Sequence, residues 1–136
     1  FLRSLLSDMV KVRIQHLASN NLLHIKDGRL EAKAAADSTN PETFFLKNER
    51  GETGGAINSK LVHLQHDANN GHFIVLKEGV GAVGTTADTF EWVIGRGFTA
   101  FKCNGKFLAF DSQGEPVAVA KFDKSCKMKV IPEKQQ

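Results

Sequence analysis

The chain has 136 residues, of which 41% are hydrophobic and 24% are charged, and its net charge is +3. This length suits one globular domain with a substantial core and is too short for two. The apolar runs are far shorter than the roughly 20 residues that cross a bilayer, so we expect a single domain over 1–136 without a transmembrane segment.

The first nine residues place their leucines on one side of a possible short amphipathic helix. Ser4, Ser7 and Asp8 interrupt the apolar stretch, which makes the segment unsuited to the core of a signal peptide. We therefore expect no leader in this chain. Its localisation is left open between secreted and cytoplasmic.

A threefold pattern of strands begins at Val10. Each unit has an alternating strand, a second strand ending at glycine and a third apolar strand. The first strands are predicted at Val10–Gln15, Lys60–Gln65 and Phe98–Cys103. The second are predicted at Leu22–Gly28, His72–Gly79 and Lys106–Gly114, and the third at Phe44–Leu46, Phe90–Val93 and Met128–Ile131.

Internal repetition of this kind predicts a β-trefoil, an all-β fold of three pseudo-repeats and twelve strands that form a barrel with a hairpin cap. The repeats are expected at about 10–59, 60–97 and 98–136. The first is longest because of a hydrophilic loop, Asn48–Ser59, that contains three glycines. Long surface loops are tolerated at little cost, so this loop is either an insertion without a role or a functional segment.

Two motifs in the second repeat suggest ligand chemistry. His63 and His66 have an H-x-x-H spacing, but residues three apart on a strand face opposite sides and cannot hold one metal ion. Gly79–Gly84 matches the dinucleotide pattern G-x-G-x-x-G, which requires a helix directly after it. The residues that follow are typical of a strand, so we interpret the glycines as a flexible hairpin with positive φ angles.

Cys103 and Cys126 are too few for a disulfide-dependent secreted scaffold, and we expect free thiols buried on strands. The carboxylates Glu49, Glu52, Asp88 and Asp111 lie in loops or at strand ends with no paired arrangement. Nothing in the sequence therefore indicates catalysis. We expect no enzyme activity, no cofactor and no metal site.

Phenylalanine dominates the aromatic residues, with ten Phe, one Trp and no Tyr. Binding surfaces favour Tyr and Trp, whose rings combine apolar area with a polar group. We therefore assign seven phenylalanines to the core: Phe44, Phe45, Phe73, Phe90, Phe101, Phe107 and Phe110.

Basic residues gather near the C-terminal end. The last sixteen residues hold five lysines against two carboxylates, which equals the net charge of the whole chain. The candidate site for an anionic partner consists of Lys121, Lys124, Lys127 and Lys129. Such a patch attracts a sulfated polysaccharide, a phosphoinositide or the acidic surface of a protein filament. The alternative is that these lysines guard a solvated sheet edge.

The first repeat resembles that of the fibroblast growth factors. The resemblance rests on NLLHIKDGRLE at Asn21–Glu31, DSTN at Asp37–Asn40 and FFL at Phe44–Leu46. The motifs at Gly71–Val75 and Gly105–Asp111 fit that family and equally its structural relatives, the fascins and hisactophilin. The resemblance spans about Val10 to Ile131. It implies a growth-factor or cytokine-like ligand with a protein receptor and a weak heparin-type site.

The chain departs from growth factors in its third repeat, where Asp111–Pro116 replaces a strongly basic loop and no tyrosine-rich stretch lies between Trp92 and Phe98. That compact junction resembles fascin, so the alternative is an intracellular actin-associated protein. A carbohydrate-binding lectin is the third hypothesis, although the Q-x-W motif of ricin-type lectins is absent at Trp92. In each case we expect a monomer that does not bind nucleic acid.

Overall fold

The computed structural model describes residues 11–33, 42–48, 61–68, 71–77 and 80–133. Its first seven strands are β1 (Lys11–His16), β2 (Asn21–Leu22), β3 (His24–Lys26), β4 (Arg29–Glu31), β5 (Phe44–Asn48), β6 (Leu61–His66) and β7 (Phe73–Lys77). They are followed by β8 (Val80–Gly84), β9 (Phe90–Ile94), β10 (Thr99–Cys103), β11 (Lys106–Phe110), β12 (Pro116–Val119), the 3₁₀ helix η2 (Lys124–Cys126) and β13 (Met128–Pro132).

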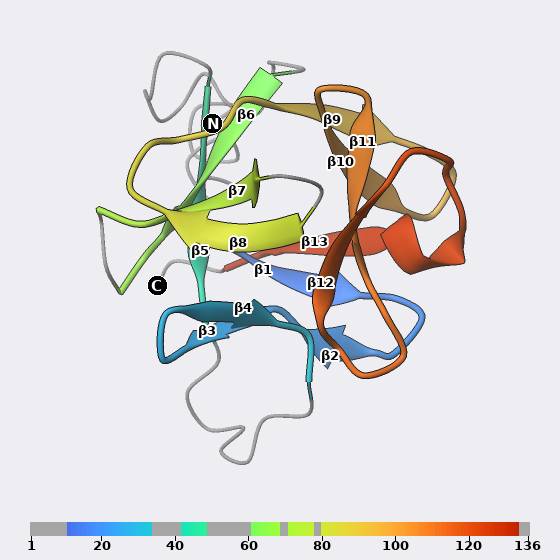
Figure 1. Ribbon diagram of the computed structural model, residues 1–136, viewed down its shortest axis with the longest axis horizontal. Helices are drawn as coiled ribbons and strands as arrows, with labels where there is room; N and C mark the ends of the chain where they lie inside the picture. Colours follow the sequence, from blue (N-terminus) through green and yellow to red (C-terminus); the bar gives the residue numbers. More distant parts are fainter. Residues whose placement is uncertain (1–10, 34–41, 49–60, 69–70, 78–79, 134–136) are drawn as a thin grey trace.

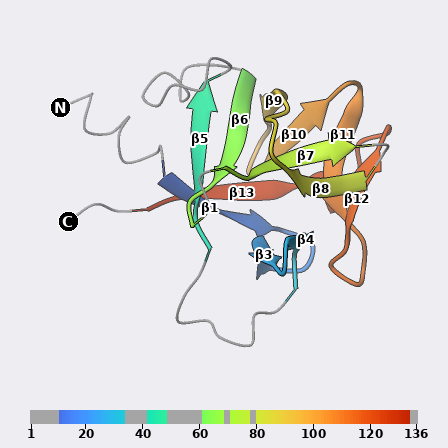
Figure 2. The ribbon, with the colours of Figure 1, turned by 60° about the vertical axis from the view of Figure 1, so that its left-hand side comes forward.

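Six strands close into a barrel. β1 pairs with β5, β5 with β6, β6 with β9, β9 with β10, β10 with β13, and β13 with β1, all antiparallel. Figure 2 shows β5 and β6 side by side in this wall. Because the ring returns to β1, none of these six strands is an edge.

The other strands form one hairpin in each repeat: β3 with β4, β7 with β8, and β11 with β12. Figure 1 looks onto these hairpins, with β8 in front and β4 and β12 beside it. β2 and β3 occupy one position in the repeat, separated only by Leu23. The strands therefore divide into three sets of four, and the predicted β-trefoil is confirmed.

Alternating side chains fill the barrel. In β1 the buried positions are Val12, Ile14 and His16, while the residues between them are partly exposed. The core holds four fully buried phenylalanines: Phe44, Phe90, Phe101 and Phe110. The assignment of Phe45, Phe73 and Phe107 to the core is wrong, because all three are only partly buried.

The interpretation of Gly79–Gly84 needs correction. Val80–Gly84 is strand β8, and positive φ is found at neither Gly81 nor Gly84, while Gly79 lies outside the described residues. A Cβ at Gly81 would approach Pro116 Cβ to 2.8 Å, so this glycine allows β8 to lie close to β12. Within 80–94 a strand and not a helix follows, contrary to what dinucleotide binding requires.

Two features predicted from sequence lie outside the described residues: the N-terminal amphipathic helix and all of the 48–59 loop except Asn48, which ends β5. Within the described part of the chain, no helix has the length and apolar character to span a bilayer.

A small ionic network joins β1 to the end of β6. Lys11 Nζ lies 3.1 Å from Asp67 Oδ2, and Thr43 Oγ1 donates to the same oxygen at 2.6 Å. Partial burial would raise the pKa of Asp67, but the hydrogen bonds from Thr43 and Lys11 and the lysine charge outweigh it, and the pKa lies below its ordinary value. The ionised carboxylate therefore stabilises the folded chain.

This network predicts a component of acid sensitivity. Since the folded pKa is lowered, the stabilisation is complete above about pH 4 and is lost as pH falls through the folded value. The wild-type chain is expected to lose unfolding free energy between about pH 6 and about pH 3. Asp67→Asn is expected to make that loss smaller by at most about 1 kcal/mol, measured by urea denaturation. Asp27→Asn, in an exposed turn, is the control. A wild-type pH dependence in Asp67→Asn would contradict this role.

Candidate functional site

The structure places the four predicted lysines along one segment that follows β12. Lys121 lies after the strand, Lys124 begins η2, Lys127 follows η2, and Lys129 lies in β13. Lys121, Lys124 and Lys129 are exposed, and Lys127 is partly buried. β13 pairs on both sides, with β1 and with β10. Lys129 therefore does not guard a sheet edge, whereas Lys121 follows β12, a strand at the end of the sheet order.

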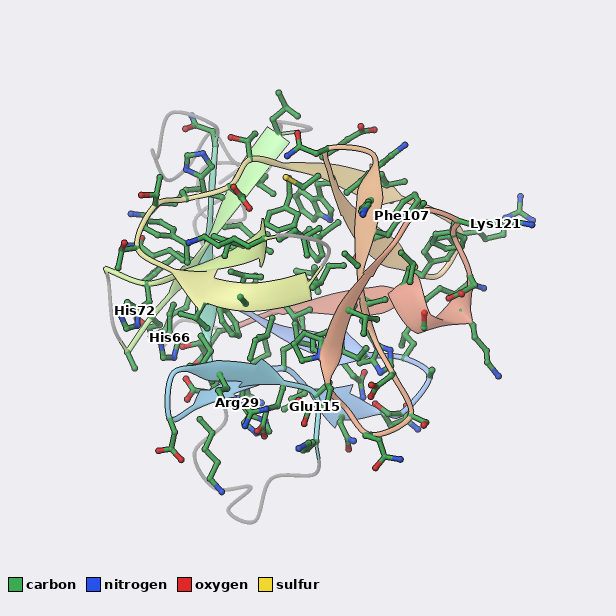
Figure 3. All side chains as sticks on the ribbon, in the orientation of Figure 1. Arg29, His66, His72, Phe107, Glu115 and Lys121 are labelled. Atoms are coloured by element: carbon green, nitrogen blue, oxygen red, sulfur yellow. The ribbon has the colours of Figure 1, made fainter. Side chains whose placement is uncertain are left out.

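Three phenylalanines form a surface cluster beside these lysines. The Phe122 ring lies 5.3 Å from the Phe98 ring and 5.4 Å from the Phe107 ring, measured between centroids. Phe122 is 37% exposed, one of the few large apolar side chains on the described surface. Figure 3 shows Phe107 and Lys121 at the same end of the molecule. We call this cluster the aromatic–lysine patch. It consists of Phe98, Phe107 and Phe122 with the lysines Lys102, Lys121, Lys124 and Lys127.

Two ammonium groups lie against the rings of this cluster. Lys102 Nζ is 5.3 Å from the Phe107 centroid, and Lys127 Nζ is 5.1 Å from the Phe98 centroid. These are cation–π distances, and such contacts hold a charge near an apolar surface without neutralising it. The aromatic–lysine patch thus combines apolar ring faces with fixed positive charge, flanked by Lys121 and Lys124.

The turn between β9 and β10 fixes Phe98. Gly95 N donates to Phe98 O at 2.9 Å, and the Phe98 ring folds back over Gly95. A Cβ at Gly95 would lie only 2.2 Å from the ring, so any other residue there would displace it. The short junction from Trp92 to Phe98 therefore determines the position of one ring of the patch.

The helix η2 is held by local hydrogen bonds. Asp123 is its N-cap, and its carboxylate accepts from the backbone N–H and the hydroxyl of Ser125. The Ser125 hydrogen bonds lower the pKa of Asp123, which remains ionised and committed to the cap. Its charge also interacts with that of Lys124, although no lysine nitrogen lies within ion-pair distance of it among the described residues.

A buried histidine ties η2 to the barrel. His16 Nε2 donates to the Ser125 carbonyl at 2.9 Å, and His16 Nδ1 lies 2.8 Å from Ser19 Oγ. The His16 ring also packs edge-on against Phe110 in the core. The segment that carries Lys124 and Lys127 is consequently attached to β1 by this hydrogen bond.

The lysines of the patch lack acidic partners. Among the described residues, no carboxylate lies within ion-pair distance of Lys102, Lys121, Lys124, Lys127 or Lys129. Elsewhere, Lys11 and Lys33 are paired, with Asp67 at 3.1 Å and with Glu115 at 2.7 Å. An excess of positive charge without close ion pairs, beside exposed aromatic rings, is suited to an anionic ligand.

Sequence reasoning found the lysines of the patch and missed its rings and Lys102. A signal was present in the Asn104-Gly105 turn, because a two-residue hairpin fixes the register of its strands. That register pairs Lys102 with Phe107, as observed between β10 and β11. Lys129 is the predicted residue least connected to the patch, since it lies farther along β13, opposite Gln15.

The other candidate residues have structural surroundings. His63 lies near Thr89 and His66 near Glu42, so the two point apart, and no metal-binding group of side chains occurs among the described residues. Cys103 and Cys126 are free and buried, and burial raises the pKa of both thiols. Cys126 lies in η2 and not on a strand, which corrects its expected position. Asp88 accepts a hydrogen bond from Leu76 N at 2.8 Å.

No protein-family model and no curated protein sequence matches the chain. Solved structures do match its fold. A GlcNAcα1-4Gal-releasing endo-β-galactosidase from Clostridium perfringens superposes with a TM-score of 0.73 at 11% identity, over 91% of this chain. The match covers 32% of the enzyme, so this chain spans about a third of its length. The Rhizoctonia solani agglutinin superposes with a TM-score of 0.69 at 13% identity, over 90% of this chain and 94% of the agglutinin.

Proposed function

We propose that this chain is a non-enzymatic saccharide-binding module whose aromatic–lysine patch binds an anionic saccharide. The observation that carries the proposal is the group of lysines without acidic partners around the ring cluster Phe98, Phe107 and Phe122. Ammonium groups bind sulfate or carboxylate, and the ring faces cover the apolar side of a sugar.

The structural neighbours support a saccharide as the ligand. The agglutinin matches over nearly its whole length, and the endo-β-galactosidase acts on a glycan. The positive charge of the patch supports an anionic saccharide, because two of its lysines, Lys124 and Lys127, lie on a segment that hydrogen bonds hold in place.

The test is binding of a heparin-derived hexasaccharide to the full chain, measured by calorimetry at low and moderate salt. Lys121→Glu/Lys124→Glu is expected to weaken binding about tenfold, since each reversal replaces attraction by repulsion in a partly solvated site. Raising the salt concentration is expected to weaken wild-type binding as well, because exposed charges are screened.

The matched control is Lys26→Glu/Lys77→Glu, which makes the same change in net charge at two exposed lysines on other hairpins. It is expected to change the affinity less than twofold. Equal losses in the two double variants would mean that only net charge matters, and would overturn the assignment of the patch. Phe122→Ala separates the aromatic contribution, and we expect it to weaken binding with no change in salt dependence.

Growth-factor-like signalling and actin association stay predictions from the sequence resemblance. Both need a protein partner, and among the described residues we find no feature that favours one over the other. Binding of the hexasaccharide at the aromatic–lysine patch would be compatible with a growth-factor-like ligand, whereas co-sedimentation with filaments would favour the actin-associated alternative.

A further inference from the structure

A cavity of about 520 Å³ lies where the three hairpins meet. Its walls are residues 28–30 at the first hairpin, 81–83 of β8, and 115–117 with Asp111 from the third. Figure 1 shows β4, β8 and β12 around this point, and Figure 3 shows Arg29 beside Glu115, apart from Phe107 and Lys121. The cavity is therefore distinct from the aromatic–lysine patch, and its volume lies within the range of about 300–1,000 Å³ for small-molecule pockets.

Close packing at Gly81 and a hydrogen-bonded turn fix the walls of this cavity. A Cβ at Gly81 would lie 2.8 Å from Pro116 Cβ and 2.9 Å from Leu108 Cδ1, so β8 packs directly against the third hairpin and the two close one side of the cavity. On the opposite side, Asp111 Oδ1 accepts from Gln113 N at 2.8 Å and from Glu115 N at 3.0 Å. Ala32 N donates to Gly114 O at 2.9 Å, which joins this turn to the first hairpin. The cavity is preformed, and this lowers the entropic cost of binding.

The charges around the cavity nearly cancel. Glu115 binds Lys33 at 2.7 Å and Arg29 at 3.4 Å, and the hydrogen bond from Lys33 lowers the pKa of Glu115, so this pair is ionised at neutral pH. Two further charged groups lie at the cavity. One is the Asp111 carboxylate, and the other is the Arg29 guanidinium, which contacts Glu115 through one nitrogen and whose side chain is 70% exposed. Such a site repels neither sign strongly. It offers an acceptor and several donors close together.

The rest of the lining is aliphatic. Ala82, Val83, Pro116 and Val117 lie on the hairpin edges and are partly buried, while Leu30 is buried beneath them. A ligand that suits these walls has one apolar face and several hydroxyl groups that both donate and accept. This combination is the chemistry of an uncharged sugar ring and differs from that of a sulfated chain.

We propose that the hairpin-junction cavity is a second binding site, for a neutral monosaccharide or the neutral end of a glycan. Asp111 Oδ2, the carboxylate oxygen that these turn hydrogen bonds do not use, accepts from sugar hydroxyls and Arg29 donates to them, while Val83, Pro116 and Val117 cover the C–H face of the ring. This site does not depend on the aromatic–lysine patch, because the two share no residue.

The test is a titration of the isotope-labelled full chain with galactose, mannose and N-acetylglucosamine, each alone, followed by amide NMR shifts. At least one of these sugars is expected to move the signals of residues 81–83 and 115–117 with a saturable curve. Asp111→Asn keeps the shape of the turn but removes the charge, and is expected to weaken that sugar about tenfold, as for the loss of a charge-assisted hydrogen bond.

Ala82→Phe is a second variant that fills the cavity from its wall and is expected to abolish the shifts. Ala18→Phe, in the exposed β1–β2 turn, is the matched control and is expected to bind as the wild type does. Failure of all three sugars to move these signals, or unchanged binding in both Asp111→Asn and Ala82→Phe, would overturn the second site. Hexasaccharide binding to the same variants reports on the aromatic–lysine patch separately, so the two proposals fail independently.

Discussion

Phe101→Ala is expected to lower the free energy of unfolding by about 3–5 kcal/mol, the range for removal of a fully buried phenylalanine. Phe101 has no exposed surface and lies in β10, where its ring meets the Phe90 ring edge-on at 6.3 Å between centroids. Alanine would leave a cavity beside the Phe90 ring inside the closed barrel, which cannot collapse without disturbing the pairing of β9 and β10. Urea denaturation monitored by circular dichroism measures the change.

Phe122→Ala is the matched comparison, because it removes the same atoms from the surface. The Phe122 ring is 37% exposed and contacts two rings of the aromatic–lysine patch. Its loss is expected to lower the unfolding free energy by about 1–2 kcal/mol, the scale of two aromatic pairs, and so by less than Phe101→Ala. If both variants lost equal stability, the division into a buried core and a ligand-facing ring cluster would be wrong.

The sequence contained enough information to predict the barrel. Alternating apolar residues in β1, β6 and β10 placed the first strands within one residue of their observed starts. The strands that follow the hairpin turns, β4, β8 and β12, were not located individually. They are short, and β8 contains two glycines. Alternation is weak in such strands, and tertiary contacts between hairpins determine their structure.

The residues of the candidate sites were predicted only where they lie close together in the sequence. Lys121, Lys124 and Lys127 lie in one segment, so their shared charge was visible. Phe107 was assigned to the core because a strand pattern cannot show that it lies opposite Lys102 at the surface. The hairpin-junction cavity collects residues from three repeats, and its formation depends on how closely β8 approaches β12. The sequence pattern of a single repeat gives no information about the distance between hairpins of different repeats.

Gly114→Ala is expected to lower the free energy of unfolding by about 2–4 kcal/mol, from two causes that act together. Gly114 has a φ of +79°, a conformation that costs an alanine roughly 1–2 kcal/mol. A Cβ there would also lie 2.7 Å from the carbonyl oxygen of Ala32, which accepts a hydrogen bond from the Asn21 amide. The methyl group would push the third hairpin away from the first.

Gly105→Ala isolates the first of these causes. Gly105 has the same φ of +79°, in the turn between β10 and β11, but a Cβ there meets nothing within 4 Å. Its loss of stability is therefore expected to be about 1–2 kcal/mol, and the excess in Gly114→Ala measures the contact between hairpins. Thermal and urea unfolding of the two variants side by side give this difference. Equal losses would mean that the first and third hairpins can separate freely, and the cavity between them would then not be preformed.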